Sequence, residues 1–338
     1  MDEYLQQKIE ELKAKNLWRQ PKDSSAAGFL NFTSNDYLGL RTRPEVVEAA
    51  MKATEKYGAG SGASRLAGGN YELHDEFEAK IAAYKGYEAA CVFGSGYMAN
   101  LGVIQAFAGE GDVVLADKFS HASIIDGVRL SGAKLVRFAH NDMQDLDSRL
   151  HGNDNVKLIV TEEIFSMDGD KAPNILMSPL MLDGAHSLYG PEYPEAEIYV
   201  GTMSKALGSY GAYVCGSRKF IEYIKSSARS LIYSTALPPA ALGAAIKALE
   251  IAGREQLYLK TLDNAKLLGA NSAIIPIIIG DEAKALEAEA HLRSKNILVN
   301  AIRTPTVPKG TARLRITVTA KHTKEEIEIL AEELKKVI

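Results

Sequence analysis

The sequence has little cysteine, no excess of positive charge and no long apolar run. Its two cysteines among 338 residues, Cys91 and Cys215, exclude a disulfide framework, and both lie in apolar strand-like runs, so we expect reduced core thiols and a cytoplasmic protein. The net charge of -4 gives no reason to expect nucleic acid as a partner. No apolar run is long enough for a membrane span, and residues 1–20 lack the apolar core of a signal peptide, so no membrane partner is expected.

Motifs for two other chemistries are also missing. Without a G-x-S-x-G elbow a serine hydrolase is not expected, and without a His and Cys cluster at ligand spacing no metal is expected. Residues 57–69, YGAGSGASRLAGG, contain a loose dinucleotide fingerprint, but a helical pattern precedes it where that fingerprint needs a strand. A nicotinamide-dependent dehydrogenase is therefore kept as an alternative that this context disfavours.

What is present is the alternation of an α/β protein. The composition, 46% hydrophobic and 24% charged residues, is that of an ordinary globular protein, and the length allows more than one domain. Helical periods alternate with short, continuous apolar strands, which is typical of a parallel or mixed sheet covered by helices on both faces. We expect an N-terminal helix and arm over residues 1–42, a large domain over 43–240 and a smaller α+β domain over 241–338.

The expected elements follow from these periods. An amphipathic helix opens the chain, and the final helix begins with a capping box formed by Thr323 and Glu326. Between them we expect helices over residues 43–58, 71–86, 96–109, 218–234, 238–253 and 281–296. The expected strands cover residues 89–93, 112–117, 134–139, 156–165, 181–186, 197–203, 212–217, 273–280, 297–302 and 312–319.

Lys205 stands in GTMSKALGSYGAYV, residues 201–214, among small residues just after an apolar strand. A lysine chosen at random is usually a solvated surface group. In an apolar, water-poor pocket at a strand end, however, the ammonium form is disfavoured and the neutral amine that attacks a carbonyl becomes accessible. The setting favours a Schiff-base lysine without establishing one.

Three further features accompany this lysine. The strand at 89–93 ends in a Gly-Ser-Gly turn at 94–96 before a helix, a place that favours a phosphate, although a plain tight turn is the alternative. His121 stands at another helix start, where a capping role is the alternative to catalysis. Asp183 and His186 end an apolar strand and could project toward the carboxyl edge of the sheet. Together with the lysine, these features match what pyridoxal phosphate requires of a protein.

Several segments, in order, resemble the α-oxoamine synthases, which are fold-type I pyridoxal-phosphate enzymes. The resemblance runs from about residue 15 to the C-terminus and implies a mostly parallel sheet between helices with a smaller C-terminal α+β domain. Members of the family join an amino acid to an acyl thioester with loss of carbon dioxide. The segments are NFTSNDYLGL, GSGASRLAGG, HASIIDGVRLSGA, FSMDGDKAP, GTMSKALGSYGAYV, YSTALPP and RTPTVPKGTARLRIT.

Within the family, SNDYLGL, GSYGAYV and STALPP are most similar to the branch that condenses L-alanine with a pimeloyl thioester in biotin biosynthesis. The donor could be pimeloyl-CoA or a pimeloyl carrier protein. The branch that acetylates glycine more typically has an asparagine where Asp36 stands, and it is the alternative. A catalytically inactive relative is a further alternative, which the intact set of site residues disfavours.

The resemblance also implies roles for individual residues. Lys205 would form the Schiff base with pyridoxal phosphate, His121 would stack on its ring, and Asp183 would pair with the ring nitrogen. His186 would contact the phenolic oxygen. Further cofactor contacts are expected from Gly96, Tyr97, Ser166 and Thr202, and from Thr235 across the interface of a homodimer with shared active sites. Substrate contacts are expected from Arg19, Asn35, His121, Thr306 and Arg303, the last pairing with the amino-acid carboxylate.

Three departures from the family pattern stand out. Only NILMSPL separates Pro173 from Met181, where relatives have a longer helical crossover, and a parallel crossover generally takes a dozen or more residues. The segment before Ala273 is similarly shorter than usual. Gly184 stands where relatives often carry an acidic residue. We expect these departures to affect architecture and stability more than the active residues.

Overall fold

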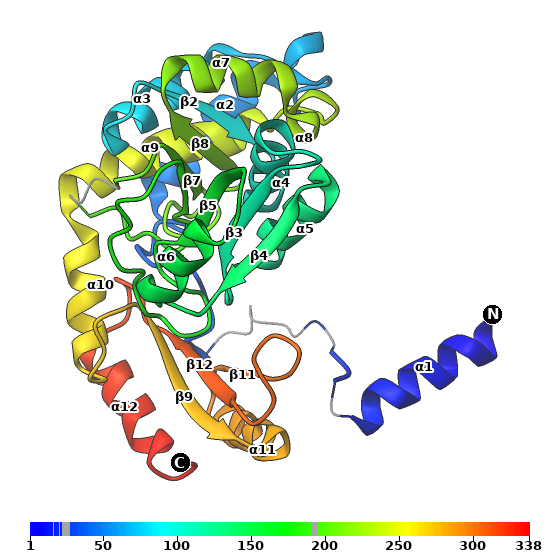
Figure 1. Cartoon of the computed structure of the whole chain (residues 1–338). Coiled ribbons are helices and arrows are strands. Elements are labelled where there is room, and N and C mark those ends of the chain that lie inside the picture. The colour runs from blue at the N-terminus through cyan, green and yellow to red at the C-terminus, as the bar shows by residue number, and fades with distance from the viewer. Residues whose placement is uncertain (16, 20, 22–27, 191–194) are drawn as a thin grey trace. The chain divides into compact units, whose positions relative to one another are not determined.

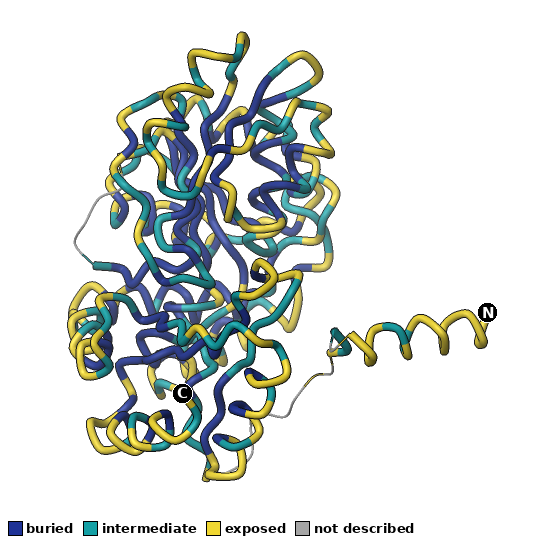
Figure 2. Tube along the Cα trace, turned by 60° about the horizontal axis from the view of Figure 1, so that its bottom comes forward, coloured by how far each residue is buried: buried dark blue, intermediate teal, exposed yellow. Residues whose placement is uncertain are grey.

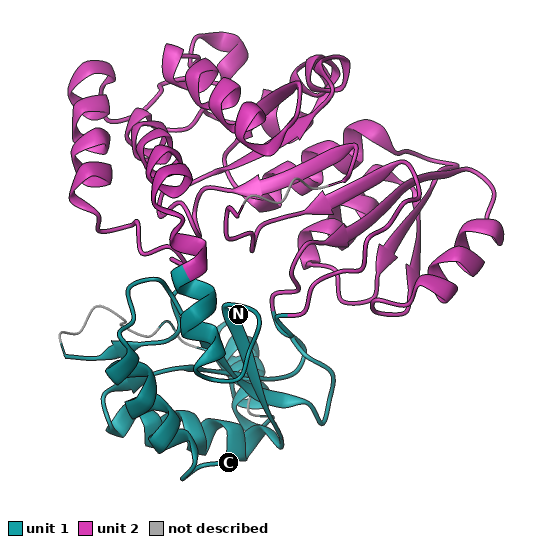
Figure 3. Ribbon diagram, turned by 90° about the vertical axis from the view of Figure 1, so that its left-hand side faces the viewer, with its two compact units in different colours: residues 1–35, 167–169, 260–338 teal, residues 36–166, 170–259 magenta. Residues whose placement is uncertain are grey.

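The computed structural model of the chain divides into two compact units, which Figure 3 colours separately. One unit comprises residues 36–166 and 170–259, and the other comprises residues 1–35, 167–169 and 260–338. The expected domain limits at residues 42 and 240 stay predictions. The structure describes the whole chain except residues 16, 20, 22–27 and 191–194.

The unit of residues 36–166 and 170–259 contains, among its described residues, a seven-stranded sheet in the order β2-β8-β7-β6-β5-β3-β4 (Figure 1). Strand β8 runs antiparallel to both its neighbours, and the remaining neighbours pair in parallel, which confirms the expected mostly parallel sheet. Because β2 and β7 both oppose β8, they point the same way. The strands are β2 (Ala89–Phe93), β3 (Val113–Asp117), β4 (Lys134–Phe138), β5 (Val156–Glu162), β6 (Leu180–Asp183), β7 (Ile198–Thr202) and β8 (Ala212–Gly216).

The helices expected in this unit lie close to their ranges, with one difference, and the helices at Met143–His151 and Leu257–Lys266 were not expected. The helix expected over 218–234 is two helices, because Ala228 adopts an extended conformation with φ -70° and ψ 105° between them. The helices are α2 (Pro44–Tyr57), α3 (Glu72–Lys85), α4 (Gly96–Phe107), α5 (Ala122–Ser131), α6 (Met143–His151), α7 (Arg218–Ser227), α8 (Arg229–Ile232) and α9 (Pro239–Glu255), with a short 3-10 helix at Arg65–Ala67. Helix α10 (Leu257–Lys266) continues into the other unit.

Each face of the sheet has its own apolar core. Alternate residues of a strand point to opposite faces, so Val160 of β5 and Met181 of β6 pack with α4, α5 and α7, whereas Ile159 and Leu180 pack on the other face with Leu146 of α6. We call these the α4 face and the α6 face. By the same alternation, Glu162 and Asp183 lie on the α4 face.

The other unit confirms the expected α+β pattern. Its described residues form an antiparallel sheet in the order β11-β12-β9 and a parallel pair, β1 with β10. The capping box forms as expected, with Thr323 Oγ1 accepting from the Glu326 N–H at 3.2 Å. The elements are α1 (Asp2–Ala14), β1 (Leu30–Asn31), β9 (Ile274–Gly280), α11 (Glu282–Ser294), β10 (Ile297–Leu298), β11 (Asn300–Ile302), β12 (Ala312–Thr317) and α12 (Lys324–Leu334).

The burial of the two cysteines agrees with the expectation of core thiols. Both cysteines are free and buried, and burial raises the pKa of the Cys91 thiol to about 12. In Figure 2 helix α1 is exposed along most of its length, and it has no buried residue. In the part of the chain that the structure describes, no helix has the length and apolar character needed to cross a membrane.

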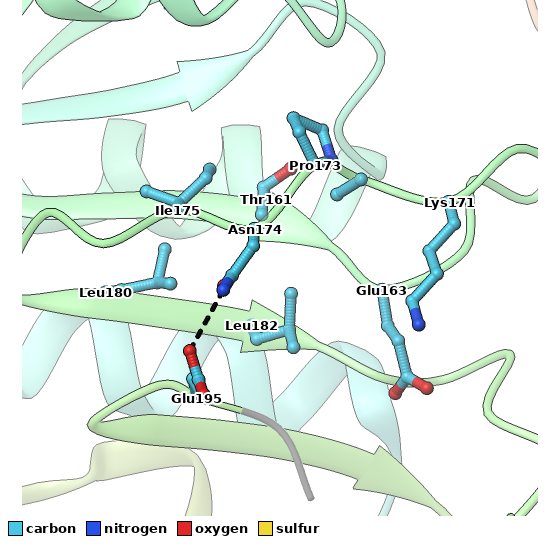
Figure 4. Close-up of a pocket in the computed structure, with 10 residues that line it drawn as sticks. Thr161, Glu163, Lys171, Pro173, Asn174, Ile175, Leu180, Leu182 and Glu195 are labelled. Carbon is cyan, nitrogen blue, oxygen red and sulfur yellow. Dashed lines mark hydrogen bonds between the residues drawn. The ribbon is translucent and has the colours of Figure 1, made fainter. Parts of the chain in front are cut away.

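The connection between β5 and β6 contains no helix. Residues 163–179, all of which the structure describes, form an antiparallel bridge between Ile164 and Lys171 and then run without regular structure to β6. A cavity of about 440 Å³ lies beside this connection (Figure 4). Leu182 and Thr161 line it from β6 and β5, so it belongs to the α6 face, where a crossover helix would pack. The cavity lining comprises Thr161, Glu163, Lys171, Ala172, Pro173, Asn174, Ile175, Leu180, Leu182 and Glu195.

Candidate active site

Five strands bring their carboxyl ends to one edge of the seven-stranded sheet. Strands β3, β5, β6 and β7 are mutually parallel, and β2 points the same way. The segments that follow these strands carry Gly96 and Tyr97 after β2, His121 after β3, Ser166 after β5, Asp183 and His186 at and after β6, and Thr202 and Lys205 at and after β7. The topology therefore gathers eight residues predicted for the cofactor at the edge where open α/β sheets bind ligands.

The turn after β2 is a tight cradle at a helix start. Ser95 caps α4, its Oγ accepting from the Met98 N–H at 3.2 Å. A Cβ at Gly96 would lie 2.8 Å from Cγ2 of Thr202, so a larger residue would push the helix start away from β7. The first N–H groups of a helix and its dipole favour an anion. This close approach of backbone to strand fits a phosphate group.

Asp183 is buried and held by neutral donors. Its Oδ2 accepts from Asn100 Nδ2 at 2.7 Å, and its Oδ1 accepts from the Ala185 N–H at 3.0 Å. The same Nδ2 of Asn100 donates to Ser123 Oγ at 2.9 Å. Hydrogen bonds donated to a carboxylate favour its ionised form. A buried carboxyl group at a ligand-binding edge suits the predicted pairing with a ring nitrogen, and that role stays a prediction.

His121 is the N-cap residue of α5, and the structure shows that the capping role and a place in the site coexist. Its Nδ1 accepts from the Ser123 N–H at 3.2 Å and lies 2.7 Å from Ser123 Oγ. Tyr97 meets the imidazole edge-on, with ring centroids 6.3 Å apart. Burial, joined by the charge of Lys205 and opposed by that of Asp183, lowers the pKa of His121. The ring is therefore neutral at physiological pH, which suits stacking on an aromatic cofactor.

His186 and Lys205 complete the edge. His186 is buried, and its Nδ1 lies 2.6 Å from the hydroxyl of Tyr37, which is itself fully buried. Lys205 is half-buried in the turn after β7, and its carbonyl accepts from the Gly208 N–H at 2.9 Å, which closes that turn. Thr202, the last residue of β7, is buried, and its Oγ1 donates to the Ala185 carbonyl at 3.1 Å. That bond ties the ends of β6 and β7 together.

Thr235 and Ser166 are placed differently. Thr235 is exposed and forms an antiparallel bridge with Ser64, which brings YSTALPP against the glycine-rich loop that we judged unsuited to a nicotinamide cofactor. That loop follows helix α2 and no strand, as expected. Ser166 is half-buried and follows Phe165 beyond β5. The roles of both residues stay predictions.

Four of the five predicted substrate residues, all except His121, belong to the other unit. Arg19 donates from Nη2 to Thr306 Oγ1 at 3.0 Å, although the two residues are far apart in sequence. The Thr306 N–H donates to the carbonyl of Arg303 at 3.0 Å, so these three predicted residues form one group. Asn35 is held by a different partner, since its Oδ1 accepts from Arg315 Nη1 at 3.2 Å.

Sequence reasoning missed four residues that hold this edge. Asn100 and Ser123 connect Asp183 to His121, Tyr37 contacts His186, and Glu162 accepts from the backbone N–H of His121 at 2.6 Å. The polar side chain of Asn100 within an apolar helix was a signal for its role, since buried polar groups need partners. The pairing of Tyr37 with His186 spans two distant segments and had no such signal.

The chain belongs to the aminotransferase class I and II family, whose model matches residues 27–334. Curated relatives match most of the length of this chain. A Caulobacter sp. (strain K31) protein named putative 8-amino-7-oxononanoate synthase is 44% identical, over 98% of this chain and 97% of the relative. An 8-amino-7-oxononanoate synthase of Methylobacterium nodulans is 46% identical, over 90% of this chain and 86% of the relative.

Solved structures confirm the fold-type I architecture. Serine palmitoyltransferase from S. paucimobilis, solved with a PLP–myriocin aldimine, has a TM-score of 0.86 at 28% identity and covers 98% of this chain and 96% of its own. The 8-amino-7-oxononanoate synthase of Francisella tularensis has a TM-score of 0.79 at 29% identity and covers 92% of this chain and 98% of its own. These likenesses confirm the family resemblance stated from the sequence.

The same comparisons bear on the shortened segments. The alignment with the Caulobacter protein extends over 372 positions although this chain has 338 residues, so at least 34 positions are filled by the relative alone. The helix-free connection of residues 163–179 is one place where the expected shortening agrees with the structure. The site residues at the sheet edge are nevertheless all present.

Proposed function

We propose that the chain is a pyridoxal-phosphate-dependent acyltransferase, an 8-amino-7-oxononanoate synthase. It would condense L-alanine with a pimeloyl thioester, release carbon dioxide and the thiol carrier, and serve biotin biosynthesis. The main support for this function is the intact set of predicted cofactor residues at one sheet edge, in a chain that is 44% and 46% identical to two relatives of that name. Coenzyme A and a carrier protein both suit the chemistry as thiol carriers.

The residues fit the cofactor in a definite arrangement. The start of α4 at Gly96 would hold the phosphate, Asp183 the ring nitrogen, and His186 the phenolic oxygen. When bound, pyridoxal phosphate supplies an electron sink that makes a proton beside the amino group removable. Asp183, whose oxygens accept from Asn100 Nδ2 and the Ala185 N–H, would pair with the ring nitrogen. The amine of Lys205 would act as the general base that removes the proton beside the amino group of the substrate.

The substrate carboxylate is assigned to Arg303. A guanidinium forms two parallel hydrogen bonds with a carboxylate, which fixes the orientation of an amino acid. Arg19 and Thr306 form a neighbouring polar pair in the same unit, and Asn35 is assigned a supporting contact. Alanine rather than glycine remains the proposed amino acid on the strength of the relatives' name.

The proposal also includes a cytoplasmic homodimer. Aromatic side chains are exposed beside the cofactor edge and in the segment of Thr235, with Tyr97 at 42% and Tyr233 at 73% exposure. Tyrosine is enriched where subunits meet, and this supports the assignment of Thr235 to a partner's cofactor. Two buried free thiols agree with a reducing compartment.

Borohydride reduction tests the cofactor and its lysine. The purified protein loaded with pyridoxal phosphate should give, after reduction and peptide mapping, one modified lysine at Lys205. Lys205→Ala should abolish the adduct, whereas Lys118→Ala, which changes an exposed lysine after β3, should leave it in place. A reducible adduct that persists in Lys205→Ala would refute the assignment.

The substrate is tested by pairing alanine and glycine with pimeloyl and acetyl thioesters, each supplied on coenzyme A and on a carrier protein. We expect the highest kcat/KM for alanine with a pimeloyl donor. Preference for glycine with the acetyl donor would overturn the assignment within the family and favour glycine C-acetyltransferase.

A further inference from the structure

Glu162 is a buried acid at the candidate site that none of the roles above uses. It is the last residue of β5 and is 3% exposed. Its register partner on the parallel strand β6 is Asp183, the last residue of that strand. Neighbouring strands are about 4.8 Å apart and register partners share a face, so the two carboxyl groups leave the sheet side by side.

Two adjacent carboxyl groups in a buried environment cannot both be ionised at low cost. The donors around the pair decide which one carries the proton. Asp183 accepts from Asn100 Nδ2 and from the Ala185 N–H, whereas Glu162 accepts from the His121 N–H. The greater number of donors favours the anion on Asp183, so the proton belongs on Glu162.

The charges that face Glu162 support this distribution. Burial, followed by the charge of Asp183, raises the pKa of Glu162 well above its usual range. Asp117 of β3 acts in the same direction, while the His121 N–H and the charge of Lys205 oppose it. The opposing groups do not offset burial beside a second acid.

Glu162 also closes a ring of contacts. From Asp183 the hydrogen bonds run through Asn100 and Ser123 to the imidazole of His121, and the backbone N–H of His121 returns to Glu162 Oε1 at 2.6 Å. The N–H of an N-cap residue has no partner within its helix. Glu162 therefore fixes the backbone from which the imidazole projects.

We propose that Glu162 is a positioning residue, which as a neutral carboxylic acid holds the main chain of His121 and leaves Asp183 as the ionised member of the pair. The inference rests on the proposed cofactor site. Its consequence is that cofactor affinity depends on Glu162 through His121, and that the acceptor oxygen of Glu162 is needed while its charge is not.

A double-mutant cycle on the full chain tests this coupling, with the dissociation constant of pyridoxal phosphate as the readout. Glu162→Ala should weaken binding about tenfold in the wild-type background, which corresponds to about 1.4 kcal/mol, and less than about twofold in a His121→Ala background. Glu162→Gln, which keeps the acceptor and lacks the charge, should restore the wild-type constant. Equal losses in both backgrounds would overturn the proposal, as would a Gln variant that behaves like the Ala variant.

Two further readouts separate positioning from simple loss of structure. Without cofactor, hydrogen exchange at the His121 amide should be slow in wild type and in Glu162→Gln and fast in Glu162→Ala. With cofactor, the pH titration of its absorbance should have the same midpoint in Glu162→Gln as in wild type. A shifted midpoint would show an ionised Glu162 and refute the proposal.

Glu163→Gln is the matched control. In the wild type, the Glu163 carboxylate accepts from the Tyr199 hydroxyl at 2.8 Å, and the Glu163 side chain lies on the α6 face of the sheet. The cofactor affinity of Glu163→Gln should therefore stay within about twofold of the wild-type value. Absence of any borohydride adduct in wild type would defeat the proposed function. The exchange protection of the His121 amide would still decide the role of Glu162.

Discussion

Gly184 offers a prediction whose magnitude follows directly from the structure. A Cβ built on it would lie 1.9 Å from the hydroxyl oxygen and 2.2 Å from Cζ of Tyr199. Tyr199 is fully buried, its hydroxyl donates to Glu163 at 2.8 Å, and the Lys85 ammonium lies 4.7 Å from its ring centroid. Gly184→Ala must therefore move a fully buried ring or the backbone beside it.

The cost combines two losses. Overpacking a well-filled core costs about 1–3 kcal/mol, and losing a hydrogen bond to a charged acceptor costs about 1.5–3 kcal/mol. We expect Gly184→Ala to lower the free energy of unfolding by about 3–5 kcal/mol, as measured by urea denaturation followed by circular dichroism. An acidic residue at this position, as relatives often carry, should cost at least as much here.

Two further variants make the reasoning refutable. At Gly109 an added Cβ would meet nothing within 4 Å, so Gly109→Ala should change stability by less than about 0.5 kcal/mol. Combining Gly184→Ala with Tyr199→Leu should cost less than the sum of the single changes, because the ring that clashes is gone. A loss below about 1 kcal/mol for Gly184→Ala, or strict additivity in the double variant, would show that the contact with Tyr199 does not set the cost.

Three other predictions each concern a single side chain. Burial opposes the charged form of His140, but its hydrogen bond to Asp117 and the charges of Asp117 and Asp170 outweigh burial and raise its pKa. The stability that this group contributes is therefore full below about pH 6.5 and is lost as the pH rises through the raised pKa. His140→Gln should remove this pH dependence from thermal unfolding between about pH 6 and 8. A pH dependence that persists in the variant would assign it to other groups. Asn100→Ala should lower the free energy of unfolding by about 2–3 kcal/mol, because Asp183 and Ser123 lose a buried donor; a change under about 0.5 kcal/mol in urea titrations would contradict this. Thr323→Ala should cost about 1 kcal/mol through the lost cap of α12, whereas an unchanged melting temperature would mean that the helix end contributes nothing.

Local patterns predicted most of the elements because local physics forms them. The continuous apolar run at 89–93 is a buried strand with the predicted limits, and the capping box at Thr323 forms both of its hydrogen bonds. The break at Ala228 was not predicted, since alanine favours helix and nothing in the sequence marks the extended residue between α7 and α8.

The candidate site likewise has features that local patterns predict and features that depend on the packing of distant segments. Positions at strand ends could be inferred, because the carboxyl ends of parallel strands share one edge, and Asp183 and Lys205 lie there. The contacts of Tyr37 with His186 and of Glu162 with the backbone of His121 depend on how distant segments pack. The family resemblance supplied residue roles that geometry alone did not give, and those roles await the reduction and binding experiments.

The helix-free connection after β5 has a consequence for how the chain finds its fold. Residues 163–179 must close before β5 and β6 can pair, and closure entropy grows only with the logarithm of length. A connection longer by about a dozen residues would raise that cost by about 0.5 kcal/mol. The pairing of the two strands is thus nearly indifferent to whether a helix lies between them. A designer could insert a helical segment before Leu180 to cover the cavity and still expect Glu162 and Asp183 to meet in the same register.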